Sequence, residues 1–193
     1  ATGGTYTLVI DPSGGTTGTF TYVLSAIDEV PVPIVADGTS RTGSTTLAGE
    51  VSRRTFTVAA GRRVYARVTG PATGTTISIL GPDGAVVAGP VASLGGATAV
   101  ETVLGSAPSG GTYSLLVDPA GSVTGDYAAI VSVIDEQPIA VTGDGTTRTV
   151  VTTLPGERIE LEFPVTVGQR VLATVASPSV GTRIVLSLPS GAT

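Results

Sequence analysis

Residues 4–18 have the sequence GTYTLVIDPSGGTTG, and residues 111–125 have the sequence GTYSLLVDPAGSVTG, 107 positions later. The two parts of the chain stay in one register without a gap, and almost half of residues 4–86 are identical to their counterparts in residues 111–193. Chance similarity between segments of biased composition does not hold one register over that length. The sequence therefore predicts a structural repeat of 107 residues.

Apolar side chains alternate with polar ones inside the repeat, and this period of two is the pattern of half-buried strands. The predicted inward-facing sets are Tyr113, Leu115 and Val117, then Tyr127, Ala129 and Val131, then Phe56 and Val58. Their counterparts one repeat away are Tyr6, Leu8 and Ile10, then Phe20, Tyr22 and Leu24, then Phe163 and Val165. No stretch has a helical period. The pattern predicts an all-β fold.

Turn residues separate the predicted strands. Gly81, Pro82, Asp83 and Gly84 follow one Ile-rich strand, and residues 60–62 lie between two Val-rich runs, so both stretches are predicted to be hairpins. About eight short strands per repeat fit tandem antiparallel β-sandwich modules. Their topology is jelly-roll or immunoglobulin-like, and the sequence favours neither.

Proline-bearing stretches at equivalent positions, residues 30–33 and residues 137–138, interrupt the alternation and predict extended connectors. On this division residues 31–137 form one complete β-sandwich module. Residues 1–30 are the C-terminal strands of a preceding module, and residues 138–193 are the N-terminal half of a following one.

Neither partial module closes its own core, because a strand pair or half a sandwich leaves an apolar face and an open edge exposed. Two arrangements are therefore open. In the first, the polypeptide continues in both directions as a covalent array. In the second, the N-terminal strands of one copy complete the C-terminal half-module of its neighbour in a head-to-tail filament. An exchanged module of this kind lacks the counterparts of residues 87–107, and hence at least one strand.

The composition narrows the class of protein. Hydrophobic residues make up 41% of the chain but aromatic residues only 4%, with 27 Gly and 13 Pro. There is no Cys, Met, His, Trp, Lys or Asn, so disulfides and N-glycosylation are excluded. No apolar run is long enough to span a bilayer and no leader is visible, so we expect no membrane insertion. A net charge of -5 with scattered arginines predicts no nucleic acid partner.

The chain lacks most of the residue types that enzymes use for catalysis. Without His, Cys or Lys the chain has no triad base, thiolate nucleophile, Schiff-base amine or usual zinc ligand set. Glu157, Glu160 and Glu162 cluster near Arg158, and the last two glutamates have the spacing of a carboxylate pair on one strand face. Their counterparts are an arginine and a threonine, which favours a solvated strand face. We predict no enzyme, and no catalytic or cofactor-binding residue.

Repeated acids raise the question of calcium. Asp28 and Glu29 return as Asp135 and Glu136 near the predicted module boundaries, where some extracellular arrays bind calcium. Two adjacent acids provide too few ligands, so Asp37 and its counterpart Asp144 would have to converge on them. A strand-end pair facing solvent explains the same residues without a metal, and no metal ligand is assigned.

The motifs themselves carry a resemblance. GTYTLVIDP or GTYSLLVDP, a strand ending in IDE, VAAGRRVYARV or VTVGQRVLATV, and ISILGPDGA resemble the long tandem repeats of large secreted and surface proteins of actinobacteria and related bacteria. Those repeats are similar to the bacterial pre-peptidase C-terminal domain, an eight-stranded sandwich. The resemblance covers almost the whole chain and implies non-catalytic spacers or accessory binding modules.

These observations together predict a non-catalytic structural repeat of an extracellular stalk, fibre or filament. Its expected partners are neighbouring modules of the same chain or head-to-tail copies of itself, and its expected location is extracellular or at the cell surface. The alternative is an accessory adhesion or carbohydrate-binding module of a secreted protein. That alternative requires an exposed aromatic or acidic patch on the sandwich.

Overall fold

The computed structural model describes residues 3–94, 98–176 and 182–187, and among these residues there are strands but no helix. The chain divides into two compact units. The first consists of residues 1–136 together with 152–158, and the second of residues 137–151 together with 159–193. The all-β prediction is confirmed for the part of the chain that the structure describes.

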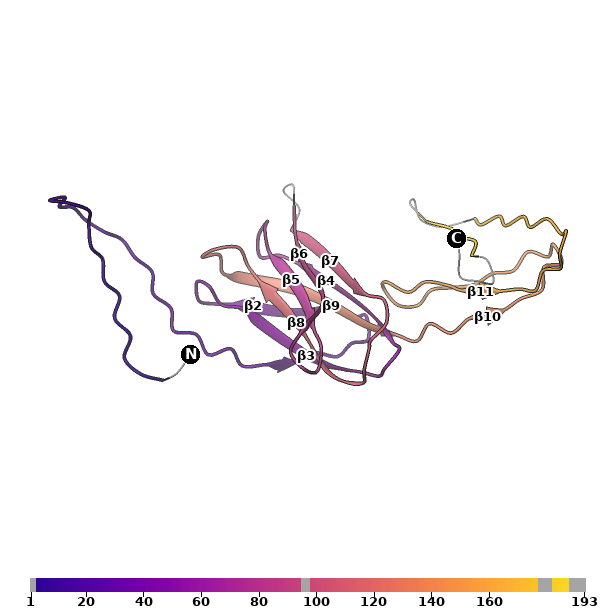
Figure 1. Cartoon of the computed structure of the whole chain (residues 1–193), viewed down its shortest axis with the longest axis horizontal. Coiled ribbons are helices and arrows are strands. Elements are labelled where there is room, and N and C mark those ends of the chain that lie inside the picture. The colour runs from indigo at the N-terminus through magenta and orange to yellow at the C-terminus, as the bar shows by residue number, and fades with distance from the viewer. Residues whose placement is uncertain (1–2, 95–97, 177–181, 188–193) are drawn as a thin grey trace. The chain divides into compact units, whose positions relative to one another are not determined.

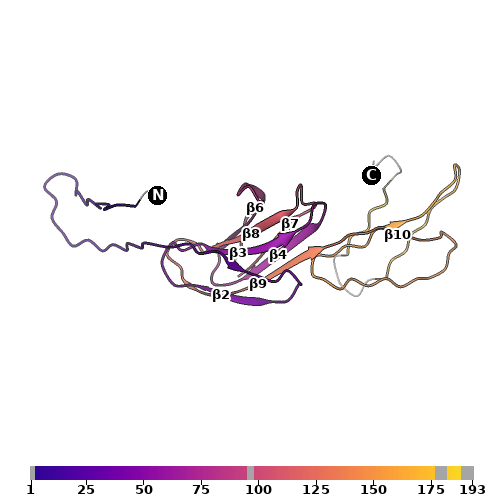
Figure 2. The same ribbon diagram turned by 90° about the horizontal axis from the view of Figure 1, so that it is seen from below.

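The strands of the first unit run from β1 to β9 (Figures 1 and 2). They are β1 (Val32–Pro33), β2 (Arg41–Thr45), β3 (Ser52–Val58), β4 (Arg63–Thr69), β5 (Thr76–Leu80), β6 (Val86–Ala92), β7 (Ala99–Leu104), β8 (Gly111–Asp118) and β9 (Gly125–Ile134). The second unit contains β10 (Ile139–Ala140) and β11 (Leu161–Glu162).

Two sheets form the first unit, one in the order β1-β3-β8-β5-β6 and the other in the order β2-β9-β4-β7. All neighbouring strands are antiparallel except β1 and β3. Apart from the β5–β6 hairpin, successive strands from β2 to β9 lie in different sheets. In an immunoglobulin sandwich the first two strands share a sheet, whereas here the connections alternate as in a jelly roll. The strand order thus answers a question that the sequence left open.

The core lies between these sheets and is built from the predicted inward faces. The buried cluster contains Phe56, Val58, Tyr113, Leu115, Val117, Tyr127, Ala129 and Val131, each 5% exposed or less. Val64, Ala66 and Val68 of β4 and Ile77 and Ile79 of β5 complete its centre. The period of two therefore identified the buried face of β3, β8 and β9 correctly.

The two predicted hairpins have different outcomes. Residues 81–84 do connect the paired strands β5 and β6, with the Gly81 amide donating to the Ala85 carbonyl at 2.8 Å. Residues 60–62 form a turn, but the hairpin prediction is wrong because β3 and β4 lie in different sheets. Both edges of β3 are already paired, with β1 and β8. The turn bonds instead to Ala107, which accepts from Gly61 and donates to Arg62, each at 2.8 Å.

The N-terminal segment contrasts with the sandwich. Among residues 3–30 no strand is formed, and Leu8, Phe20 and Leu24 are 57%, 50% and 75% exposed. A strand is stabilised by its ladder partners and by the core it covers, and these residues show neither. The two strands expected there are not formed in this structure, and the division into one complete and two partial modules stays a prediction.

Candidate functional site

A charged cluster surrounds the largely buried Glu136, two residues after β9. Its side chain is only 9% exposed, with one carboxylate oxygen 2.6 Å from Nη2 of Arg158 and the other 3.3 Å from Nε of Arg63. Arg63, the first residue of β4, also donates to the carbonyl of Gly156 at 3.1 Å. Glu136 and Arg63 thus tie the ends of two central strands to a loop that follows much later in the chain. We call this group the Glu136 clamp.

That loop, residues 152–158, has a defined structure of its own. The carboxylate of Glu157 accepts the amides of Thr153 at 2.5 Å and Leu154 at 2.9 Å, which closes the loop on itself. Gly156 has a φ of 78°, and a Cβ there would overlap the ring of Tyr65. Glycine is therefore required both by the backbone and by the close approach to β4.

Two further acids of the calcium hypothesis have basic partners, whereas Asp28 and Glu29 are exposed and form no ion pair within the described residues. Asp135 pairs with Arg62, and Asp37 accepts from Arg41 at 2.9 Å. Guanidinium groups thus occupy places where the hypothesis needs a cation. Among the described residues no group of three or more Asp, Glu, His or Cys side chains is arranged to hold a metal ion.

The same local contacts occur one repeat apart. Asp144 pairs with Arg148 at 2.7 Å as Asp37 does with Arg41, and each aspartate also accepts the amide two residues later at 2.9 Å. In the second unit β10 and β11 pair in parallel from Ile139 opposite Leu161, which is the register of β1 and β3 moved by one repeat. Equivalent sequences therefore adopt equivalent local structure, including where no sandwich is closed around them.

The glutamates considered for catalysis are not assembled into a site. Glu157 is engaged by the loop amides, and Glu160 and Glu162 are exposed residues of the second unit. The arrangement favours the solvated strand face over an acid–base pair.

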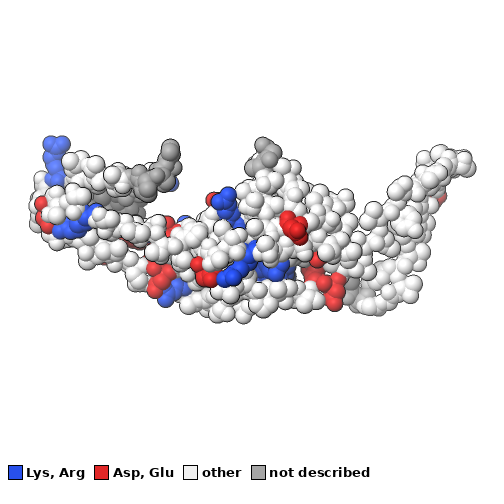
Figure 3. Space-filling view, turned by 180° about the vertical axis from the view of Figure 1, so that it is seen from behind, with Lys and Arg blue, Asp and Glu red and all other residues white. Residues whose placement is uncertain are grey.

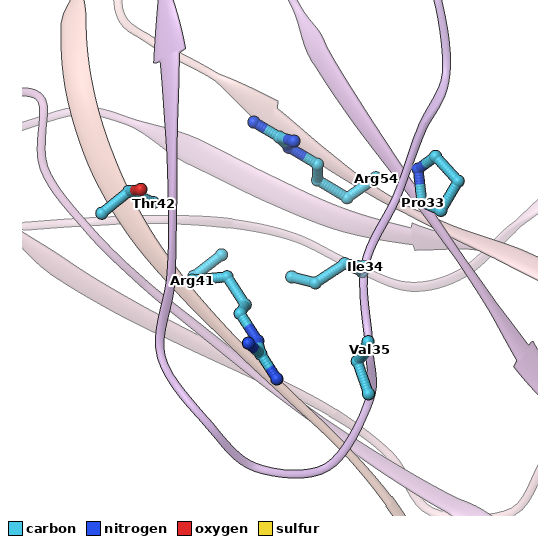
Figure 4. A pocket seen from close by; sticks show the side chains of 7 residues that line it. Pro33, Ile34, Val35, Arg41, Thr42 and Arg54 are labelled. Carbon is cyan, nitrogen blue, oxygen red and sulfur yellow. The ribbon is translucent and has the colours of Figure 1, made fainter.

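A small hollow lies between β2 and the chain that follows β1 (Figure 4). Ile34 projects into it between Arg41 and Arg54. The side chains that line it are Pro33, Ile34, Val35, Arg41, Thr42, Arg54 and Ala129. No carboxylate lines it, and the two guanidinium groups already bond to Asp37 and Tyr127. The hollow thus offers no acid or base that could activate the Thr42 hydroxyl.

Charge on the surface is mixed. Arginine and acidic side chains are interspersed on the face that Figure 3 shows, without a basic stripe of the kind that binds phosphate backbones. In the described part of the chain, no helix has the length and apolar character to cross a bilayer.

Sequence reasoning missed a second polar cluster, which lies between the sheets. The hydroxyl of Tyr127 lies 2.5 Å from the hydroxyl of Ser52 and accepts from Nε of Arg54 at 2.7 Å. The guanidinium carbon of Arg54 is 5.5 Å from the Tyr127 ring centroid. Gly43 lies directly over this cluster, where a Cβ would overlap both Arg54 and the Tyr127 hydroxyl.

The repeat contained a signal for this cluster. One repeat away, Ser52, Arg54 and Gly43 are replaced by Ile159, Leu161 and Val150, and Tyr127 is replaced by Phe20. All four positions are apolar in the other copy of the repeat. The valine there provides a side chain where Gly43 has none. Four contacting residues that change as a set indicate one packing unit.

Comparisons with known proteins give only distant similarities. No family model matches the chain, and no curated protein matches it. Among solved structures it is similar to the pre-peptidase C-terminal domain of a collagenase from Bacillus anthracis, with 20% identity over 56% of this chain and 100% of that one and a TM-score of 0.43. The sequence motifs described above also resemble pre-peptidase C-terminal domains.

Two further similarities are to PliG, a periplasmic lysozyme inhibitor of g-type lysozyme. The Aeromonas hydrophila protein has 18% identity over 54% of this chain and 96% of that one, with a TM-score of 0.41. The Salmonella Typhimurium protein has 17% identity over 54% and 98%, with a TM-score of 0.37. Likenesses at this level say nothing about activity.

The loop closed by the Glu50 carboxylate predicts that the stability of the fold depends on pH. Glu50 accepts the amides of Thr46 at 2.6 Å and Leu47 at 3.0 Å, and these bonds lower the pKa of its carboxyl from the ordinary value of 4.5. A carboxyl whose pKa is lowered by folding stabilises the folded state at pH values above its ordinary, unfolded-state pKa. This contribution is lost as the pH falls through the folded-state pKa. Glu50→Gln should therefore reduce the acid-induced loss of unfolding free energy by about a few tenths of a kcal/mol. Equal pH profiles of urea unfolding for both proteins would contradict this.

Proposed function

We propose that this chain is a non-catalytic structural segment of tandem jelly-roll modules, repeating every 107 residues, in an extracellular stalk, fibre or filament of a bacterial surface. The observation that carries the proposal is the Glu136 clamp. It attaches residues 152–158, which the repeat assigns to a following module, to the strand ends of the complete module. A clamp between successive modules is what a stalk needs and a free-standing binding domain does not.

Equivalent local structure at equivalent positions supports the tandem arrangement. The Asp37 and Asp144 turns and the β1–β3 and β10–β11 pairings have the same contacts. Glu50 and Glu157 likewise close their loops by accepting amides three and four residues earlier. Modules of such an array share turns and core positions while their surfaces differ.

The aromatic residues support a structural role over carbohydrate binding. Phe56, Tyr65, Tyr113 and Tyr127 of the proposed complete module are all buried, and none forms an exposed platform for a sugar ring. The exposed Phe20 is the counterpart of buried Tyr127, so its exposure reflects an unclosed core.

The clamp can be tested by spin labels, because the chain has no cysteine. Thr57→Cys on β3 and Thr152→Cys on the loop, both exposed, provide two label sites in the full chain. We expect a narrow distance distribution between the labels, and a broad one after Glu136→Gln. That change should also lower the unfolding free energy by about 1–2 kcal/mol, because Arg63, whose side chain is only 18% exposed, is then left without its carboxylate.

Glu101→Gln is the matched control. Glu101 pairs with Arg67 at 3.5 Å, but both side chains are about half exposed, so its loss should change the unfolding free energy by less than about 1 kcal/mol and leave the distribution narrow. A distribution that is already broad in the unmodified protein would overturn the proposed clamp, and with it the stalk.

A further inference from the structure

The hollow beside β2 has an apolar wall and room for a ring (Figure 4). Pro33, Ile34 and Val35, at the end of β1 and just after it, lie on one side, and Thr42 of β2 lies on the other. Ala129 of β9 also lines the hollow, which has a volume of about 170 Å³. An engineered apolar protein cavity of about 150 Å³ binds benzene. The hollow is therefore large enough for one aromatic ring.

The repeat supports the same size. The counterpart of Ala129, 107 positions earlier, is Tyr22. Because Ala129 lines the hollow, a tyrosine at this position would extend its ring into the hollow. The repeat thus has a phenol ring at a position where this module has a methyl group.

Arg54 brings a positive charge to the hollow without a carboxylate to neutralise it. Its side chain is partly buried, and its Nε donates to the hydroxyl of Tyr127 at 2.7 Å. Within the described residues no Asp or Glu forms an ion pair with Arg54, whereas Arg41, on the same hollow, pairs with Asp37. A guanidinium has five N–H donors, and the bond to Tyr127 uses one of them. Because a partly buried cation without a counter-ion loses solvation free energy, an anion here is favourable.

The charge and the room are not requirements of the repeat. The counterpart of Arg54 is Leu161, so an aliphatic side chain replaces the cation in one copy, and Tyr22 replaces Ala129 in the other. Residues that the fold itself needs, such as Leu115 and its counterpart Leu8, are the same in both copies. The combination of a cation with an open space is therefore a feature of residues 31–137 and not of the repeat in general.

We propose that this hollow is a binding site for a small aromatic carboxylate. The ring occupies the space between Ile34 and Ala129, and the carboxylate pairs with Arg54. No carboxylate lines the hollow, so no like charge opposes such a ligand. The binding site adds a ligand to the proposed structural function, and because all of its residues lie between Pro33 and Ala129, it does not depend on the Glu136 clamp.

Benzoate is the probe that tests this site. Titrated into the full chain, it should bind with a dissociation constant of about 1 mM and shift the backbone amide resonances of Ile34, Thr42 and Ala129 in a saturable way. Benzyl alcohol has the same ring without the charge, and acetate has the charge without the ring. Each should bind about tenfold more weakly than benzoate, because each makes only one of the two contacts.

Ala129→Tyr tests where the ring binds. The introduced ring fills the hollow, so benzoate should bind at least tenfold more weakly, while the thermal melting of the chain shows that the sandwich is still folded. Ala128→Tyr is the matched control. Ala128 is the neighbouring residue of β9 and faces the other side of the sheet, so this variant should bind benzoate like the unmodified chain.

Arg54→Gln tests where the carboxylate binds. Benzoate should bind about tenfold more weakly and benzyl alcohol equally well, a difference that a general loss of structure does not produce. Glu136→Gln should leave benzoate binding unchanged, so a failure of the clamp and a failure of this site are separable. Shifts that do not saturate with benzoate, equal binding by the Ala129→Tyr variant, or equal affinity for benzoate and benzyl alcohol in the unmodified chain would overturn the proposed site.

Discussion

Leu115→Ala is expected to lower the unfolding free energy of the sandwich by about 2–5 kcal/mol, the largest loss we predict for a single substitution. Leu115 is fully buried on β8, the central strand of its sheet, between Arg54 of β3 and Ile79 of β5. Replacing its isobutyl group by a methyl group leaves a cavity, and the two paired neighbouring strands prevent that cavity from collapsing. The total unfolding free energy of a domain of this size is about 5–15 kcal/mol. The melting temperature, measured by calorimetry, should therefore fall by about 10 °C or more.

Leu8→Ala is the matched control, since Leu8 is the same residue type at the same position of the repeat but is 57% exposed. Its effect on the unfolding free energy of the sandwich should be within about 0.5 kcal/mol. Equal losses for both variants would mean that residues 4–30 are packed into the sandwich, contrary to the structure.

Much of the core was predictable because strand period is a local property. Which face of a strand is buried depends on alternation within a few residues, and Tyr113, Leu115 and Val117 could be assigned from their own segment. The same rule correctly grouped Phe56 with Val58. Repetition strengthened the assignment, since each pattern occurs twice.

Strand pairing was less accessible because it depends on distant residues. A glycine-bearing turn such as residues 60–62 shows where a strand ends, but the same turn can join paired strands or cross between sheets. Here β1 and β8 occupy both edges of β3, and that fact is fixed by segments far along the chain. Jelly-roll and immunoglobulin orders were indistinguishable from sequence for the same reason.

The contacts of the candidate site show the same limit. Glu136 follows a recurring IDE motif, which suggested either calcium or solvent, but its partners Arg63 and Arg158 are distant in sequence or in another predicted module. Arg54 would be placed on a surface by its charge, yet it bonds to Tyr127 between the sheets. The one accessible signal was that the residues around Tyr127 change together between repeats.

Gly43→Val is the second substitution with a large expected effect. Valine is otherwise well suited to a strand, but a side chain at position 43 overlaps the guanidinium of Arg54 and the hydroxyl of Tyr127. Displacing either group costs packing strain and breaks the hydrogen bonds at the Tyr127 hydroxyl. We expect the unfolding free energy, measured by urea titration, to fall by about 2–4 kcal/mol.

The repeat also predicts how this loss is reversed. Adding Ser52→Ile, Arg54→Leu and Tyr127→Phe to Gly43→Val converts the polar set into the apolar set found at Ile159, Leu161, Phe20 and Val150. Because the residues are in mutual contact, their effects should be strongly non-additive, and the quadruple variant should recover more than half of the loss caused by Gly43→Val alone. If instead the four losses simply add, the polar set and the apolar set are not alternative packings of one site.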